Sequence, residues 1–303
     1  MRPLRALAIY LAAIFIGGAL LAPWLYWLAQ SFSGEFPWLA GNPFHRFVDR
    51  SFLGVALMGL RPFLRSVGIN SWREAGLARS AGQWKQFGAG FLLGLTSLGL
   101  AAGCVLLAGA RRLDDNLSPL RLLEKVPGIL LASVVVALLE EILFRGTLFG
   151  SLRKSLHWGM ALVLSSMFYA IVHFLQKADA AGTVTWFSGL ELLPRMLGGF
   201  ADWHAVVPGF FNLTLAGLLL GLAYQRTGNL FGSIGLHAGW VCWLKLYGDL
   251  SHPALAANAW WWGTSKMTDG WLALPVLAVT LLFYTRGSAK PKRELPHEHL
   301  RAS

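Results

Sequence analysis

Two adjacent glutamates and a following arginine are the residues of this sequence best suited to chemistry. Glu140 and Glu141 come directly after residues 126–139, which include no charged side chain, and Arg145 follows Glu141 by four positions. A carboxylate in the middle of an apolar membrane span costs about 3 kcal/mol even on the lenient insertion scale. Two of them together indicate either a functional site or a buried ion pair that serves only the structure.

The spacing gives the two glutamates different roles. Glu141 and Arg145 are at i and i+4 with the acid first, so we predict an ion pair on one helix face. Glu140 is rotated by about 100° from Glu141 and lies away from that pair. A carboxylate of this kind is a candidate general base that activates a water molecule. The competing interpretation is a structural Glu–Arg pair, with Glu140 directed into a polar seam.

A histidine follows in the next apolar stretch. His173 comes four residues after Tyr169, which places both on one face of a helix. If the chain turns near Ser155, antiparallel helices bring Glu140 and His173 to within about 5 Å of the same depth. A single histidine in a span can also serve only as a hydrogen-bonding residue between helices, so the argument depends on the whole set.

A second histidine, His237, lies among small residues in the sequence Gly-Leu-His-Ala-Gly, 235–239. Small residues allow the backbone of another helix to approach closely. Two histidines and a glutamate can orient a water by hydrogen bonds, or they can hold a catalytic divalent metal such as zinc with one open position. For His173 and His237 the sequence leaves both possibilities open. It contains no His-Glu-x-x-His pair, the common zinc-protease pattern.

These side chains need an apolar helix bundle to position them. Hydrophobic residues make up 55% of the 303 residues and charged residues 14%, whereas about a quarter of a soluble domain is charged. The apolar residues form blocks of membrane-spanning length. We predict spans at 6–29, 87–110, 126–144, 156–174, 205–224, 227–244 and 270–285.

A weaker candidate, residues 47–65, is interrupted by charges and a proline. Counting it puts both basic termini on one side, so we predict an all-α, polytopic transmembrane helix bundle of about eight spans with both termini in the cytoplasm. Residues 177–204 are predicted to form an interfacial or re-entrant connection. The transmembrane domain covers residues 1–286, with its core motifs at 126–247, and the basic tail 287–303 is predicted to be disordered.

The net charge of +11 does not indicate a nucleic-acid-binding protein. Basic residues lie at the chain ends and between the apolar blocks, as they do in the cytoplasmic loops of membrane proteins. The expected partners are therefore the lipid bilayer and a peptide or membrane-protein substrate, with no nucleic acid.

The motifs, in this order, resemble the CPBP family of intramembrane proteases, which includes CAAX prenyl endopeptidases and bacterial Abi proteins linked to bacteriocin processing and immunity. The resemblance covers about residues 126–247. It rests on Glu140-Glu141-xxx-Arg145, on Tyr169-xxx-His173 and on His237 in a later span. It implies an intramembrane endopeptidase in a bacterial inner membrane.

The resemblance also implies a role for each residue. Glu140 would activate the attacking water, and Glu141 and Arg145 would hold Glu140 in place. His173 and His237 would bind the water, a metal or the developing oxyanion. All five are therefore our candidate catalytic residues.

The sequence departs from the family pattern at two positions. Tyr169 stands where the family commonly has phenylalanine. Val241, four residues after His237, stands where the family often has asparagine, so a side-chain donor to the oxyanion is missing there. Arg145, a protonated His237 or Asn212 are the candidates to replace it.

Two other functions remain compatible with the sequence. The polar cluster could form a binding site in a non-catalytic immunity or scaffold protein. It could also form a proton relay in a transporter, since glutamate and histidine within membranes serve this purpose too. The transporter is less well supported, because no pair of broken helices occurs in matching halves of the chain.

Overall fold

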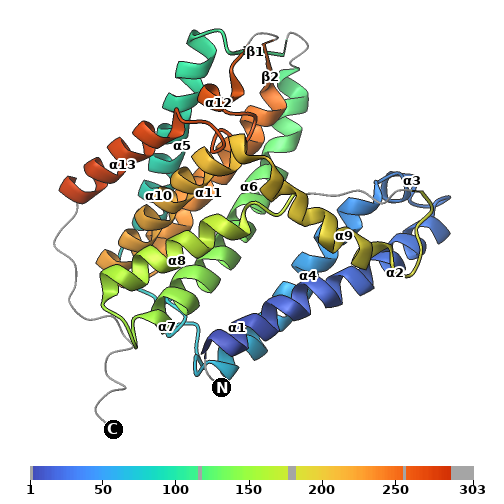
Figure 1. The fold of residues 1–303 in the computed structure, drawn as a ribbon, viewed down its shortest axis with the longest axis horizontal. Helices are drawn as coiled ribbons and strands as arrows, with labels where there is room; N and C mark the ends of the chain where they lie inside the picture. Colours follow the sequence, from blue (N-terminus) through green and yellow to red (C-terminus); the bar gives the residue numbers. More distant parts are fainter. Residues whose placement is uncertain (1–2, 115–117, 177–181, 255–256, 288–303) are drawn as a thin grey trace. The chain divides into compact units, whose positions relative to one another are not determined.

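The structure is a computed structural model, which describes residues 3–114, 118–176, 182–254 and 257–287 (Figure 1). The described residues form helices almost throughout and divide into two compact units. Unit 1 comprises residues 1–70 and 173–202, and unit 2 comprises residues 71–172 and 203–303. The predicted disordered tail lies outside the described residues, apart from Gly287.

Unit 1 is organised around a long N-terminal helix. Its pieces α1 (Pro3–Ala12), the π-helix η1 (Ala13–Gly17) and α2 (Gly18–Ser31) follow one another without a break. The unit also contains α3 (Pro37–Ala40), α4 (Phe44–Ser66), α9 (Ser188–Met196) and the 3-10 helix η3 (Leu197–Ala201). Two glycines allow close packing on α2. A Cβ at Gly18 would overlap the ring of Phe52 in α4, and one at Gly189 in α9 would overlap the Ala19 carbonyl.

Unit 2 contains most of the helices and the residues predicted for the site, except His173. Its first half consists of α5 (Gln83–Leu107), β1 (Arg111–Leu113), α6 (Pro119–Glu141), the π-helix η2 (Ile142–Phe149), α7 (Gly150–Leu152) and α8 (Trp158–Val172). Its second half consists of α10 (Trp203–Thr227), α11 (Phe231–Leu250), β2 (Ser251–Pro253), α12 (Ala259–Trp262) and α13 (Ala273–Gly287). The predicted turn near residue 155 is confirmed, because it falls between α7 and α8.

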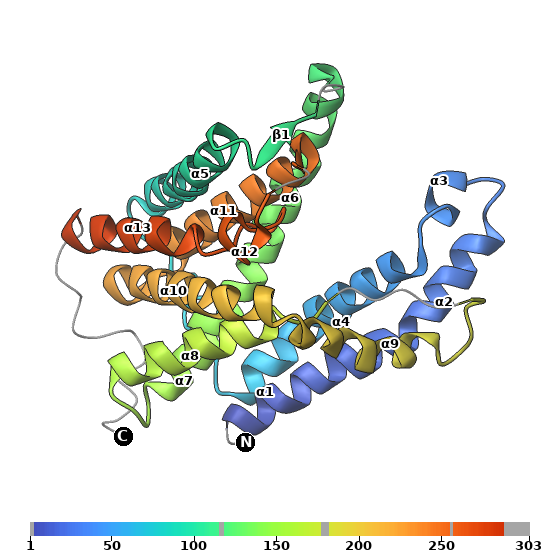
Figure 2. The same ribbon diagram turned by 45° about the horizontal axis from the view of Figure 1, so that its top comes forward.

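Helices α5 and α11 run parallel in direct backbone contact (Figure 2). A Cβ at Gly94 in α5 would overlap the carbonyl oxygen of Leu236, and a Cβ at Gly239 in α11 would overlap the carbonyl oxygen of Phe91. The close helix approach predicted from the small residues around His237 is therefore confirmed. Since His237 lies between these contact points, close packing fixes the position of its backbone.

The ends of these two helices are joined by a small sheet. Strands β1 and β2 pair antiparallel, with Arg111 opposite Pro253. The Arg111 side chain is buried, donates from Nε to Ser251 Oγ at 3.0 Å, and lies over the ring of Tyr247 at 4.9 Å from its centroid. This pair of three-residue strands is the exception to the all-α prediction.

Helix α8 packs antiparallel against α10. Added Cβ atoms at Gly217 and Gly221 of α10 would lie too close to Ser166 and Leu162 of α8, respectively. These glycines bring the segment that carries Tyr169 against the body of unit 2.

The predicted number of spans is not confirmed. Among the described residues, four helical segments are long and apolar enough to cross a membrane, namely Arg5–Ser31, Gln83–Leu107, Leu122–Leu152 and Trp203–Thr227. Helices also form over the other predicted spans, but they are shorter or more polar. The sequence thus located the helices correctly, while the structure supports four crossings by length and composition.

Candidate active site

The helix that carries Glu140 and Glu141 changes from α-helical to π-helical winding directly after them. Helix α6 ends at Glu141, and the π-helix η2 begins at Ile142. Thr147 Oγ1 donates to the Ile142 carbonyl oxygen, five residues earlier, at 3.0 Å. Short π-helical segments are rare and occur frequently at functional sites. Here the winding changes between the glutamates and Arg145.

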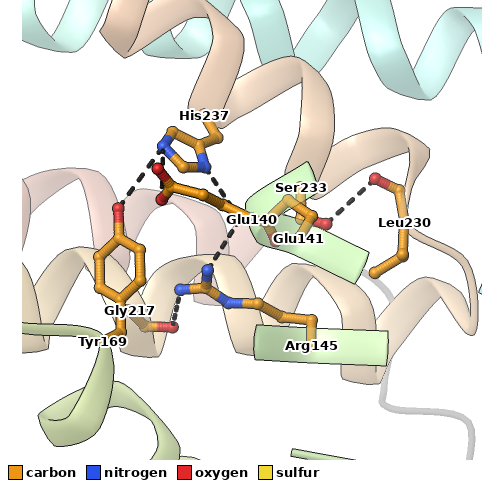
Figure 3. Close-up of polar contacts among 8 residues, drawn as sticks. All are labelled: Glu140, Glu141, Arg145, Tyr169, Gly217, Leu230, Ser233 and His237. Atoms are coloured by element: carbon orange, nitrogen blue, oxygen red, sulfur yellow. Dashed lines mark hydrogen bonds and ion pairs between the residues drawn. The ribbon is translucent and has the colours of Figure 1, made fainter. Parts of the chain in front are cut away.

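Glu141 lies fully buried at the centre of a charged cluster (Figure 3). Its Oε1 accepts a hydrogen bond from Arg145 Nη1 at 2.8 Å and lies 3.0 Å from His237 Nδ1. Arg145 and His237 are buried as well, so all three groups are removed from water. The ion pair predicted from the i, i+4 spacing is confirmed. Because an ionised carboxylate can only accept, Glu141 favours the His237 tautomer with its hydrogen on Nδ1.

The second ring nitrogen of His237 faces two other groups. His237 Nε2 lies 3.7 Å from Glu140 Oε2 and 3.5 Å from the Tyr169 hydroxyl. In a neutral ring whose hydrogen is on Nδ1, Nε2 is an acceptor. The Glu140 side chain keeps 27% of its surface exposed, whereas that of Glu141 keeps none. Glu140 therefore has the more accessible side chain of the two, although its Oε2, the oxygen nearest to His237, is itself buried.

Tyr169 of α8 belongs to this cluster through its hydroxyl and its ring. The Arg145 guanidinium lies over the ring, 4.5 Å from its centroid, and Phe144 meets it edge-on at 5.1 Å. Arg145 Nη2 also donates to the Gly217 carbonyl oxygen at 3.3 Å. Sequence reasoning gave Tyr169 no function, because its contact with His237 joins residues 68 positions apart and no local spacing indicates it.

Comparison with known proteins places this cluster in a family. Residues 122–243 match the family model described as "Type II CAAX prenyl endopeptidase Rce1-like". This segment is similar to the CAAX protease family. No curated protein and no solved structure matches the chain significantly.

The CAAX protease segment contains the five predicted site residues: Glu140, Glu141, Arg145, His173 and His237. It also overlaps most of the predicted motif region, 126–247. The family match implies a protease, and together with the apolar helices it indicates an integral membrane protein. The roles of the individual residues remain predictions.

Val241 lies in α11 one helical turn after His237 and is half-buried. Its side chain cannot donate a hydrogen bond to a substrate oxygen. The suggestion that Asn212 supplies the donor is wrong for this structure. Its side-chain amide is buried and donates to the carbonyl oxygens of Thr268 and Gly270, each at 2.8 Å. These hydrogen bonds instead connect α10 to the loop before α13.

His173 follows α8 directly and is grouped with unit 1, whereas Glu140, Glu141, Arg145 and His237 lie in unit 2. Its membership of the site therefore remains a prediction. Among the described residues no three His, Cys, Asp or Glu side chains are grouped closely enough to hold a metal ion. Glu141 engages His237 Nδ1, so Nε2 is the ring nitrogen that would bind a metal. A divalent metal at this site therefore stays a prediction.

Proposed function

We propose that this CAAX protease-family protein is an intramembrane endopeptidase in which Glu140 activates the attacking water. One observation supports this assignment most directly, namely that the two neighbouring glutamates have different surroundings. Glu141 is buried and engaged by Arg145 and His237. Glu140 retains exposed surface and lies beside His237 Nε2. Of the two side chains, Glu140 is the one with surface left for a water and a substrate.

The proposed reaction adds one water across a peptide bond. Glu140 takes a proton from the water while the water oxygen bonds to the carbonyl carbon, and the carbonyl π electrons move to the carbonyl oxygen. When the tetrahedral intermediate collapses, the C=O bond forms again and the C–N bond breaks. The leaving nitrogen takes the proton from Glu140, which returns to its carboxylate form.

His237 and Glu141 act together in this proposal. With its hydrogen on Nδ1 donated to Glu141, the imidazole presents a lone pair at Nε2, which accepts a hydrogen bond from the attacking water. A carboxylate that holds the far side of a histidine ring fixes both tautomer and orientation, as the aspartate of a serine-protease triad does. Glu141 is therefore a positioning residue, and Arg145 compensates its buried charge.

The substrate class follows from the apolar surroundings and from the family description. We propose a peptide bond in a membrane-embedded or lipid-modified chain, with a prenylated CAAX peptide as the first probe. His173 and a divalent metal are kept as the further predicted parts of the site.

The test compares membrane fractions from cells that express the wild type or Glu140→Gln. Chemical labelling of new chain N-termini, read by mass spectrometry, should reveal membrane-protein cleavage products that only the wild type generates. If both strains show the same N-termini and both proteins copurify with the same partners, the non-catalytic binding function is favoured instead.

A further inference from the structure

Hydrolysis by an activated water places negative charge on the substrate carbonyl oxygen, and this charge requires a hydrogen-bond donor. We propose that the Tyr169 hydroxyl is that donor. The inference rests on the proposed endopeptidase function and adds a catalytic residue to it. It also names a side chain that can replace the hydrogen-bond donor missing at Val241.

The position of the Tyr169 hydroxyl favours this role. It lies 3.5 Å from His237 Nε2, and the Glu140 carboxylate approaches the same nitrogen at 3.7 Å. Figure 3 shows the hydroxyl and the carboxylate directed at this one atom. A carbonyl carbon attacked by a water held between Glu140 and His237 would therefore have its oxygen within reach of Tyr169.

A substrate oxygen can compete with His237 for the hydrogen of the Tyr169 hydroxyl. An O–H donor is normally found 2.5–3.0 Å from its acceptor, so the 3.5 Å contact with His237 is long. Such contacts tighten when the reacting complex forms. Rotation about the phenolic C–O bond is sufficient to redirect the hydrogen from Nε2 to the substrate oxygen.

The ring itself is held firmly, which a donor to a transition state requires. Tyr169 is 3% exposed. The Arg145 guanidinium covers the ring face at 4.5 Å, and Phe144 packs edge-on against it at 5.1 Å. Arg145 thus supports the tyrosine in addition to pairing with Glu141.

The other candidate donors are engaged. Arg145 donates from Nη1 to Glu141 and from Nη2 to the Gly217 carbonyl, and its guanidinium lies over the Tyr169 ring, away from the hydroxyl. Asn212 gives its amide to the loop at Thr268 and Gly270. His237, with its hydrogen on Nδ1, offers a lone pair and no hydrogen at Nε2.

In the reaction the hydroxyl donates a hydrogen bond and keeps its proton. As the water oxygen bonds to the carbonyl carbon, the Tyr169 O–H shortens its contact with the oxygen that receives the π electrons. The contact weakens again when the C–N bond breaks. Losing one donor of this kind typically lowers kcat by about 10²–10³-fold.

The experiment uses the full chain in lipid nanodiscs and an internally quenched peptide with a prenylated CAAX terminus. Wild type, Glu140→Gln, Tyr169→Phe and Tyr224→Phe are compared for kcat, KM and thermal stability. Tyr224 is the matched control, because it is a fully buried tyrosine of the same unit whose hydroxyl has no hydrogen-bond partner among the described residues. A Tyr169→Phe Val241→Asn double variant tests whether a new amide donor one turn after His237 can replace the hydroxyl.

We expect Tyr169→Phe to lower kcat by about 10²–10³-fold with nearly unchanged KM, while Tyr224→Phe keeps wild-type kcat. Recovery of kcat in the double variant would identify the loss as that of a donor. A Tyr169→Phe enzyme with wild-type kcat, or an equal loss in Tyr224→Phe, would overturn the inference while leaving the proposed function intact. Wild-type activity in Glu140→Gln, or no cleavage by the wild type, would contradict the proposed function itself.

Discussion

Glu140 and Glu141 are neighbours in the chain, and the fold gives them different surroundings. Glu141 holds Arg145 and His237 in a cluster removed from water. Such a cluster is costly to assemble, since each buried ion loses its hydration, and costly to break, since the remaining ion keeps no partner. This physical difference allows a positioning glutamate to be distinguished experimentally from a catalytic one.

Glu141→Gln should therefore destabilise the protein by about 3 kcal/mol, because Arg145 is left as a buried charge without its counter-ion. Adding Arg145→Met should recover part of the loss. Asp249→Asn is the matched control, because it breaks the exposed Lys125–Asp249 pair, which is expected to contribute no more than about 1 kcal/mol. Denaturant unfolding in micelles measures all of these variants. Equal stability of Glu141→Gln and wild type would show that the pair does not hold the site together.

For single residues, the sequence predicts those contacts that spacing along one helix determines. The i, i+4 spacing was sufficient for the Glu141–Arg145 pair. The contacts of His237 with Glu141 and of Tyr169 with His237 depend on how three helices meet, and no spacing within one helix encodes them. For the same reason the sequence does not reveal that Asn212, a polar residue in an apolar helix, has a structural role. Its hydrogen-bond partners lie in a loop that is distant in the sequence.

The elements that position the site are held by glycines. Helix α11, which carries His237, packs closely against α5 at Gly94 and Gly239. The small residues around His237 were sufficient to predict this approach from sequence. The identity of the partner helix was not predictable, since α10 also carries glycines at which another helix packs closely, at Gly217 and Gly221.

Gly94→Ala should lower stability by about 1–3 kcal/mol, because the new methyl group overlaps the Leu236 carbonyl and forces the helices apart. It should also lower kcat, since the displaced helix carries His237. Gly103→Ala in the same helix α5 is the control. A Cβ there meets nothing within 4 Å, so higher helix propensity should leave stability equal or raised by up to about 1 kcal/mol. Identical unfolding curves for the two variants would contradict the packing argument.

For the molecule as a whole, the number of membrane crossings depends on which helices are long and apolar enough to span the bilayer. Composition and hydropathy located the helices, and four of the described ones are apolar and long enough to cross. Helices α8 and α13 are apolar but shorter, and α4 carries several charges. Whether short or charged helices cross depends on neighbouring helices and lipid, which hydropathy along one segment does not capture.

The eight-span topology predicts which loops face the cytoplasm. The loop after α4 is basic and should be cytoplasmic, and the loop after α2 should lie on the opposite side. In a background with Cys104 and Cys242 replaced by alanine, a cysteine at Gly34 should react with an impermeant thiol reagent in intact cells, whereas a cysteine at Ser80 should react only after lysis. Both positions are exposed. Labelling of Ser80→Cys in intact cells would contradict this topology and the cytoplasmic termini with it.

The central claim, that Glu140 activates the attacking water, is tested most directly by the kcat of purified Glu140→Gln measured beside its thermal stability. The substitution keeps the side-chain volume and removes the base, while the Glu141–Arg145–His237 cluster stays intact. We expect loss of turnover by about 10²–10⁴-fold, the usual contribution of a general base, with a melting temperature close to that of the wild type. Wild-type turnover by Glu140→Gln, or a loss of turnover accompanied by an equally large loss of folding stability, would contradict it.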